Sequence, residues 1–110
     1  MLHKPKPELV HGMLELLILR TLAREEPMHG WGISKRIQQL SQDVFQLNQG
    51  SLYPALHRLE HKGWIRSHWG TSENNRRAKF YGLTQLGKNH LIEERAQWDV
   101  FTKAVEQVLV

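Results

Sequence analysis

Residues 48–61 read NQGSLYPALHRLEH and combine features of a helix with features that oppose one. The three leucines stand at i, i+4 and i+7, the spacing of one helical face. Gly50 and Pro54 come near the beginning, and both residue types disfavour the interior of a helix. The stretch therefore predicts an amphipathic helix with an unusual first turn.

The start of this helix has two readings. In one, Ser51 is the N-cap and Pro54 lies in the first turn, where its missing N–H loses little. In the other, Asn48 is the N-cap and the first turn is bent around Pro54.

The composition of the chain excludes several classes of protein. It has 110 residues, which predicts a single domain, and no cysteine, which excludes disulfides and thiolate metal sites. The first residues lack the apolar core of a signal peptide, and the longest apolar run, 16–19, is too short to span a membrane. We expect a cytoplasmic protein without membrane contact.

The net charge of +4 is concentrated in one third of the chain. Residues 49–82 carry six basic and two acidic side chains, whereas 1–48 carry six and five, and 83–110 carry three and four. A solvated charged surface would explain this as well as a polyanion partner would, so charge alone does not decide.

The pattern along the chain predicts four helices and a hairpin. The predicted helices cover 9–24, 29–40, 48–63 and 85–109, and the predicted strands cover 64–69 and 77–83. Gly63 is suited to a left-handed helix end, and Thr84 can cap the last helix. The apolar residues of the first helix cover more than one face, which suggests that a second chain covers part of it.

This order of elements predicts a mostly α fold with a small antiparallel β-hairpin, namely a winged helix-turn-helix with a long C-terminal dimerisation helix. We expect the DNA-binding domain to cover 1–84, with 1–8 as a frayed tail, and the dimerisation helix to cover 85–110. In this architecture the third helix enters the DNA major groove and the hairpin, or wing, touches the backbone or minor groove. The positive segment contains both, which favours double-stranded DNA as the partner.

The same residues resemble the PadR family of bacterial transcriptional regulators. The similarity covers about 9–98 and rests on these motifs: LLIL at 16–19, HG at 29–30, SLYPALHRLE at 51–60, WG at 69–70, SEN at 72–74, RR at 76–77, KFY at 79–81 and LTQLG at 83–87. The resemblance implies a homodimeric repressor on a near-palindromic operator, and a third helix that starts near Asn48. Two residues depart from the family pattern. Trp31 replaces a usual tyrosine, which should preserve packing. Gly82 replaces a larger, often basic residue, which should leave one fewer phosphate contact and weaken its strand.

The predicted operator contacts lie at the start of the third helix and in the wing. Recognition helices read bases mainly from their N-terminal residues, and basic wing residues suit phosphates or a narrow minor groove. The predicted contact residues are Gln49, Gly50, Ser51, Tyr53, Pro54, Arg58, Arg76, Arg77 and Lys79.

Two other functions fit parts of the sequence. His57, Glu60 and His61 spell the His-x-x-Glu-His pattern of one class of zinc peptidase, and two histidines at i, i+4 could share a metal ion. A catalytic site needs a third ligand, however, and none is evident, so we expect no catalytic residue, no metal and no cofactor. A winged helix that binds a protein instead of DNA is the other alternative.

The last helix carries a stripe of apolar residues suited to a partner helix. The residues predicted to form the dimer are Leu16, Leu19, Leu91, Trp98, Phe101, Val105 and Val108. Some PadR relatives that sense aromatic drugs stack the ligand between tryptophans of the two subunits. Trp98 matches that position, which implies a possible small aromatic effector.

Overall fold

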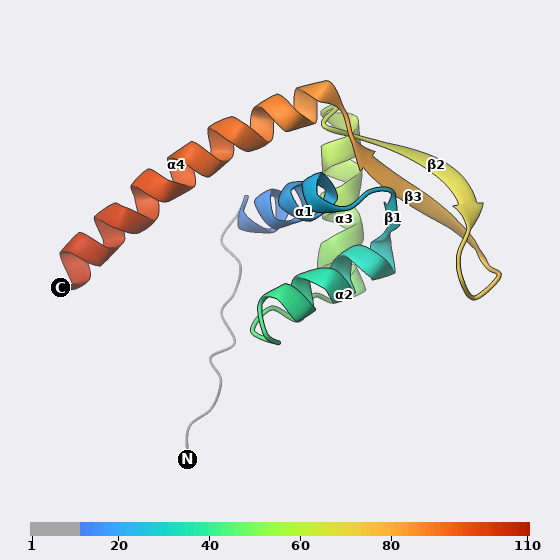
Figure 1. Ribbon diagram of the computed structural model, residues 1–110, viewed down its shortest axis with the longest axis horizontal. Coiled ribbons are helices and arrows are strands. Elements are labelled where there is room, and N and C mark those ends of the chain that lie inside the picture. Colours follow the sequence, from blue (N-terminus) through green and yellow to red (C-terminus); the bar gives the residue numbers. More distant parts are fainter. Residues whose placement is uncertain (1–11) are drawn as a thin grey trace, which may run out of the picture.

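The computed structural model describes residues 12–110 and has the predicted winged helix-turn-helix architecture (Figure 1). Its elements in chain order are α1 (Met13–Arg24), β1 (Met28–His29), α2 (Gly30–Leu40), α3 (Gln49–His61), β2 (Ile65–Thr71), β3 (Arg77–Leu83) and α4 (Gln85–Leu109). The three shorter helices pack together, the β2–β3 wing extends to one side, and α4 extends to the other (Figure 1). The predicted tail at 1–8 and the predicted start of the first helix at residue 9 lie outside the described residues.

The wing is part of a three-stranded antiparallel sheet with the order β1-β3-β2. In the hairpin, Ile65 pairs with Leu83 and Ser67 with Tyr81. A further strand, β1, was not predicted, and in it Met28 also pairs with Tyr81. The second helix accordingly begins one residue later than predicted, because His29 is its N-cap and its Nδ1 accepts from the Gly32 N–H at 3.0 Å.

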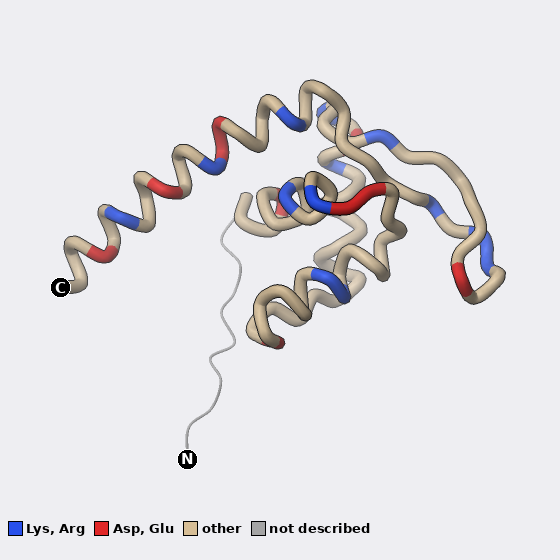
Figure 2. The backbone as a smooth tube through the Cα atoms, in the orientation of Figure 1, with Lys and Arg blue, Asp and Glu red and all other residues tan. Residues whose placement is uncertain are grey.

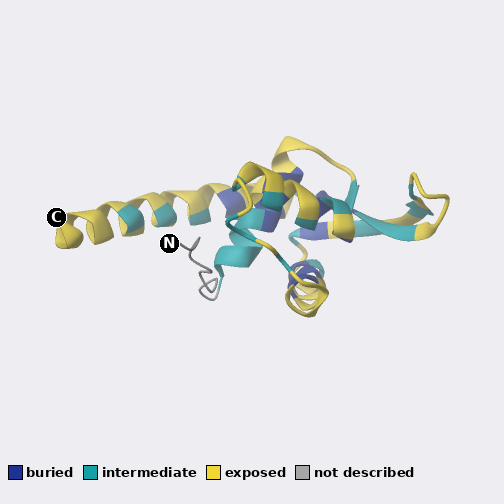
Figure 3. Ribbon diagram, turned by 90° about the horizontal axis from the view of Figure 1, so that it is seen from below, coloured by how far each residue is buried: buried dark blue, intermediate teal, exposed yellow. Residues whose placement is uncertain are grey.

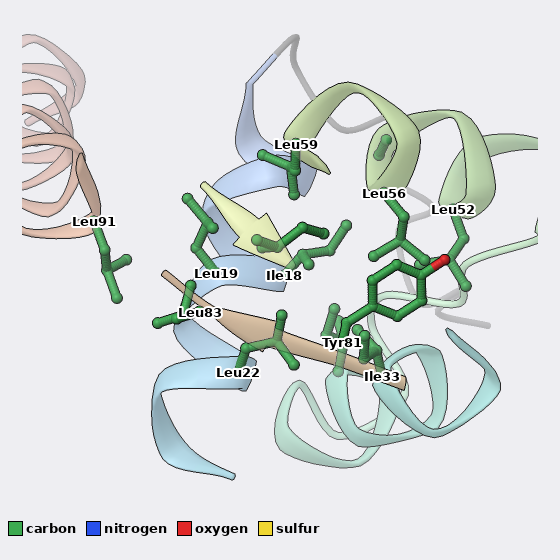
Figure 4. Close-up of a cluster of buried hydrophobic side chains, with 13 residues drawn as sticks. Ile18, Leu19, Leu22, Ile33, Leu52, Leu56, Leu59, Tyr81, Leu83 and Leu91 are labelled. Atoms are coloured by element: carbon green, nitrogen blue, oxygen red, sulfur yellow. The ribbon is translucent and has the colours of Figure 1, made fainter. Parts of the chain in front are cut away.

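One hydrophobic core joins α1, α2, α3 and the base of the sheet (Figure 4). The leucines of the opening stretch face it as their spacing predicts: Leu52, Leu56 and Leu59 are all at most 2% exposed. Tyr81 closes the core on the side of the wing. The inner face of α3 is therefore fully used in folding, and only its other sides are open to a ligand.

Short-range caps set the ends of α3 and α4 as predicted. Gly63 has φ +79°, and its N–H donates to Glu60 O while the Trp64 N–H donates to Leu59 O, the two bonds of a Schellman end. The Thr84 hydroxyl accepts from the Gly87 N–H at 3.0 Å and caps α4. Among the described helices, none is both long and apolar enough to span a bilayer.

Candidate nucleic-acid interface

The helix at the centre of the predicted interface, α3, begins at Gln49. The Asn48 side-chain oxygen accepts from the Ser51 N–H at 2.9 Å, so Asn48 is the N-cap. This confirms the earlier of the two possible starts, the one that the family resemblance implied. Gly50 and Ser51 therefore lie inside the first turn.

Pro54 then lies inside α3, one turn after Gly50. Because proline has no N–H, the Gly50 carbonyl lacks the donor that a regular helix would give it. Both residues are exposed, and a Cβ on Gly50 would meet only the Asn48 side chain, at 3.2 Å. Gly50 thus contributes no side chain to the exposed first turn of α3, which leaves its backbone open to a ligand.

The face of α3 opposite the core is open along its length. Gly50, Pro54, His57 and His61 recur at helical spacing on this face, and all four are exposed. Figure 3 views α3 nearly end-on and shows its exposed side turned away from the rest of the molecule. The two histidines thus belong to the outer surface of the helix.

The flank of α3 that faces α1 is closed by ion pairs. Arg58 Nε lies 3.0 Å from Glu15 Oε1, and Lys62 Nζ lies 3.6 Å from Glu15 Oε2. Arg58 was predicted to contact DNA, but the structure directs it to α1, away from the first turn of α3.

The flank that faces the wing is also bridged. Ser67 Oγ donates to Glu60 Oε2 at 2.5 Å, and Lys79 Nζ lies 3.6 Å from Glu60 Oε1. Lys79 thus faces α3, as a wing contact should, but an acidic side chain of α3 neutralises it. The same two contacts hold the wing against α3.

Tyr53 is fixed at the junction of α2 and α3. Its ring lies against Gly30, where a Cβ would come within 2.8 Å of the ring, so a larger residue there would displace it. Burial, and then the nearby Glu60 and Tyr53, raise the pKa of the neighbouring Tyr81 hydroxyl above its ordinary value. Tyr53 itself is only partly covered, with 44% of its surface exposed.

The outer half of the wing presents cations on an aromatic surface. Arg77 Cζ lies 4.7 Å and Lys79 Nζ 6.0 Å from the centre of the exposed Trp69 ring. Arg76 stands in the loop next to Arg77, and Figure 2 shows the Lys and Arg positions, coloured blue along the backbone, on both wing strands and in this loop. The wing therefore places two guanidinium groups at its tip, with no carboxylate bound to either within the described residues.

Comparison with known proteins agrees with this geometry. The model of the transcriptional regulator PadR-like family matches residues 18–93, which include the core, α3 and the whole wing. The chain belongs to the PadR-like family.

Related sequences cover most of this chain. Protein X of Lysinibacillus sphaericus, which is uncharacterized, is 31% identical over 108 residues, covering 92% of this chain and 98% of its own. The transcriptional regulator YqjI of Escherichia coli is 30% identical over 96 residues, covering 87% of this chain but only 44% of its own. This chain therefore corresponds to less than half of YqjI.

Solved structures show the same fold. A transcriptional regulator from Clostridium thermocellum superposes with a TM-score of 0.78 at 27% identity, covering 87% of this chain and 89% of its own. A PadR family regulator from Clostridium difficile gives 0.75 at 32% identity, covering 90% and 100%.

The zinc-hydrolase reading is not supported. Within residues 12–110, no three His, Cys, Asp or Glu side chains come together as a metal site would require. Glu60, the acid of the supposed motif, is bonded to Ser67 and Lys79. PadR-like proteins are transcription regulators, so this chain is a regulator and not an enzyme.

The structure shows the surroundings of both residues that depart from the family pattern. Trp31 is 56% exposed, and sequence reasoning missed it as a surface residue. Gly82 makes room for Glu26, whose carboxylate would lie 3.2 Å from a Cβ there. Glu26 Oε2 accepts from the Leu83 N–H at 2.6 Å and thereby ties the segment before β1 to the wing.

The predicted dimer residues fall into two groups. Leu19 and Leu91 are buried within the chain itself, and Leu16 packs against the same core. Along α4, Phe101, Val105 and Val108 are exposed, while the Trp98 ring is partly covered and its centre lies 5.6 Å from that of Phe101. The outer half of α4 therefore holds the apolar surface that the single chain leaves uncovered.

Proposed function

We propose that this PadR-like regulator is a homodimeric repressor that binds an inverted-repeat operator in the bacterial cytoplasm. The observation that carries the proposal is the open first turn of α3 beside a wing whose tip holds Arg76 and Arg77. A bare helix start can approach base edges, and guanidinium groups beside it can bind phosphates.

The predicted interface residues then have different roles in binding DNA. Gln49, Ser51 and Tyr53 offer an amide and two hydroxyls at the reading end, while Gly50 and Pro54 keep the backbone accessible. Arg76 and Arg77 contact phosphates or the minor groove, and Lys79 contributes once DNA draws it from Glu60. Arg58 contributes only long-range charge while it stays paired with Glu15.

Selection of bound fragments from a random DNA pool tests the proposal directly. We expect the selected sequences to share an inverted repeat whose half-sites are about one helical turn apart, because a twofold dimer presents two α3 helices. If no sequence is enriched in the pool and the DNA affinity does not change with salt concentration, a protein partner for this winged helix would be favoured instead.

Replacement of both wing arginines, Arg76→Ala and Arg77→Ala, tests the wing. The slope of log K against log salt should become shallower by about 2 units, because each guanidinium neutralises about one phosphate. Filter binding or fluorescence anisotropy over a salt series measures this. An unchanged slope would remove the wing from the interface.

The dimer would form through α4, with α1 beside it. Support comes from Phe101, Val105 and Val108, whose apolar side chains are left exposed by the single chain.

A small aromatic effector at Trp98 is a separate part of the proposal. Phe101 beside Trp98 offers a second ring for such a ligand, although the same ring could fill the space between two α4 helices. Titration of the dimer with planar aromatic compounds, followed by tryptophan fluorescence, should show saturable quenching that Trp98→Ala abolishes. Equal quenching of Trp98→Ala would exclude this site.

A further inference from the structure

A groove of about 300 Å³ lies between α2 and the first turn of α3, next to the proposed reading end. Its walls come from both helices, and Trp31, Lys35, Gln38, Asn48, Gln49 and Tyr53 provide its aromatic and polar surface. None of the residues that line it is acidic. The one formal charge in the groove is the Lys35 ammonium group, so its chemistry favours an anion.

Several polar groups of the groove already have partners. Gln38 donates to Asp43 at 3.1 Å, and the Asn48 side-chain oxygen caps α3. Lys35, Gln49 and Tyr53 also line the groove, and they carry an ammonium group, an amide and a hydroxyl that could serve a ligand. Lysine, glutamine and tyrosine side chains are among the usual donors to DNA phosphate oxygens.

Lys35 is held in place without being neutralised. Its Nζ lies 4.6 Å from the centre of the Trp31 ring, one helical turn earlier on α2. A tryptophan face attracts an ammonium group but leaves its full charge available. Arg58, Lys62 and Lys79 each lie against a carboxylate instead, whereas Lys35 has no carboxylate partner within the described residues.

We propose that this groove seats one backbone phosphate of the operator and the adjoining deoxyribose, with Lys35 as the phosphate contact and Trp31 as the residue that positions it. The inference rests on the proposed DNA-binding function and extends that surface onto α2. The groove shares Gln49 and Tyr53 with the reading end of α3, so a strand read there passes over it. The exposed indole face of Trp31 covers the sugar.

The test uses full-length protein and a duplex selected by the wild-type chain. Lys35→Ala should make the slope of log K against log salt shallower by about 0.9, the value for one phosphate. It should weaken selected and scrambled duplexes by the same factor, since phosphates carry no sequence information. Lys88→Ala is the matched control, because it removes the same charge from the exposed start of α4.

The role of Trp31 is tested by removing its ring and then by replacing it with another aromatic ring. Trp31→Ala should weaken binding while the salt slope falls by less than in Lys35→Ala, and Trp31→Tyr should restore most of the affinity by keeping an aromatic face. Both residues are surface-exposed, so melting temperatures should stay close to that of the wild type. A Trp31→Ala variant that binds as tightly as the wild type would overturn the positioning role.

The location of the phosphate is tested with methylphosphonates, which neutralise one phosphate at a time. One position should weaken the wild-type complex but leave Lys35→Ala unaffected. The groove proposal fails if Lys35→Ala and Lys88→Ala have the same affinity and salt slope. DNA binding itself still stands in that case, provided that Arg76→Ala/Arg77→Ala makes the slope of log K against log salt shallower. If the wild-type chain shows no salt-sensitive binding, both proposals fail.

Discussion

Gly87 fixes the position of α4 because there is no room for a side chain. A Cβ on this residue would lie 1.9 Å from the Trp64 carbonyl oxygen, a backbone atom at the α3–β2 connection. Neither segment can yield without moving a whole element, since α4 is capped by Thr84 and Trp64 follows the Schellman end of α3.

Gly87→Ala should therefore lower the free energy of unfolding by about 2 kcal/mol, the usual range for overpacking of a tight site. Urea unfolding measures it, and Lys88→Ala, one residue further along the exposed surface, should change stability by less than about 0.5 kcal/mol. Equal stability of Gly87→Ala and the wild type would contradict the close packing at this junction.

At the residue scale, the sequence revealed features that depend on near neighbours. Thr84 and Gly63 could be predicted because each acts within a few residues of its own position. The role of Gly82 could not, because it depends on Glu26, whose partner Leu83 is 57 residues away in the chain. The exposure of Trp31 could not be predicted either, since only the packing of α2 shows which side of the helix faces water.

At the level of elements, α3 is attached to its neighbours by one acidic residue on each flank. Glu15 of α1 binds Arg58 and Lys62, and Glu60 of α3 itself binds Ser67 and Lys79 of the wing. These contacts orient the helix and also reduce the positive charge that it offers to DNA.

Glu15→Gln should tighten non-specific DNA binding and steepen its salt dependence by about 1 to 2 units, because two cations lose their anionic partner. The cost in stability should be at most about 1 kcal/mol, since Arg58 and Lys62 are partly exposed. Anisotropy with an unselected duplex measures the affinity. Glu106→Gln, which removes the same charge from exposed α4, should have a smaller effect, and an equal effect of both would argue for net charge alone.

The sequence predicted those helices and strands that are long enough to show a repeating spacing of apolar residues. The helices and both wing strands meet that condition, and their observed bounds lie close to the predicted ones. The strand β1 has two residues and therefore no period, and it exists because β3 offers it a free edge. At the site, the start of α3 was predicted, whereas the pairing of Arg58 with Glu15 depends on how α1 crosses α3.

At the scale of the whole molecule, the described part measures 50 × 38 × 21 Å, and α4 extends away from the three-helix core (Figure 1). Beyond Leu91 its apolar side chains have few neighbours in the same chain: Phe101 is 56% and Val108 83% exposed. A helix with such a surface is typical of a partnered one.

Phe101→Glu should shift the protein toward monomer, because a carboxylate would be buried between two apolar helices. Sedimentation equilibrium at micromolar concentration measures this, and operator affinity should fall with the loss of the second α3. Gln107→Glu introduces the same charge on the opposite side of α4 and should leave the assembly intact. A monomeric wild-type protein would refute the dimer itself.

The junction at Gly87 also has a mechanical consequence. The Thr84 hydroxyl donates to Gly63 O at 2.6 Å, and the Thr84 N–H donates to Trp64 O at 3.1 Å. These two hydrogen bonds fix the start of α4 to the end of α3. In the proposed dimer, α4 then acts as a lever arm about 38 Å long. If the two α4 helices of the dimer tilted by roughly 5° relative to each other, the three-helix core of each subunit would move by about 3 Å. The distance between the two reading helices is thus set at the far end of the molecule from the DNA.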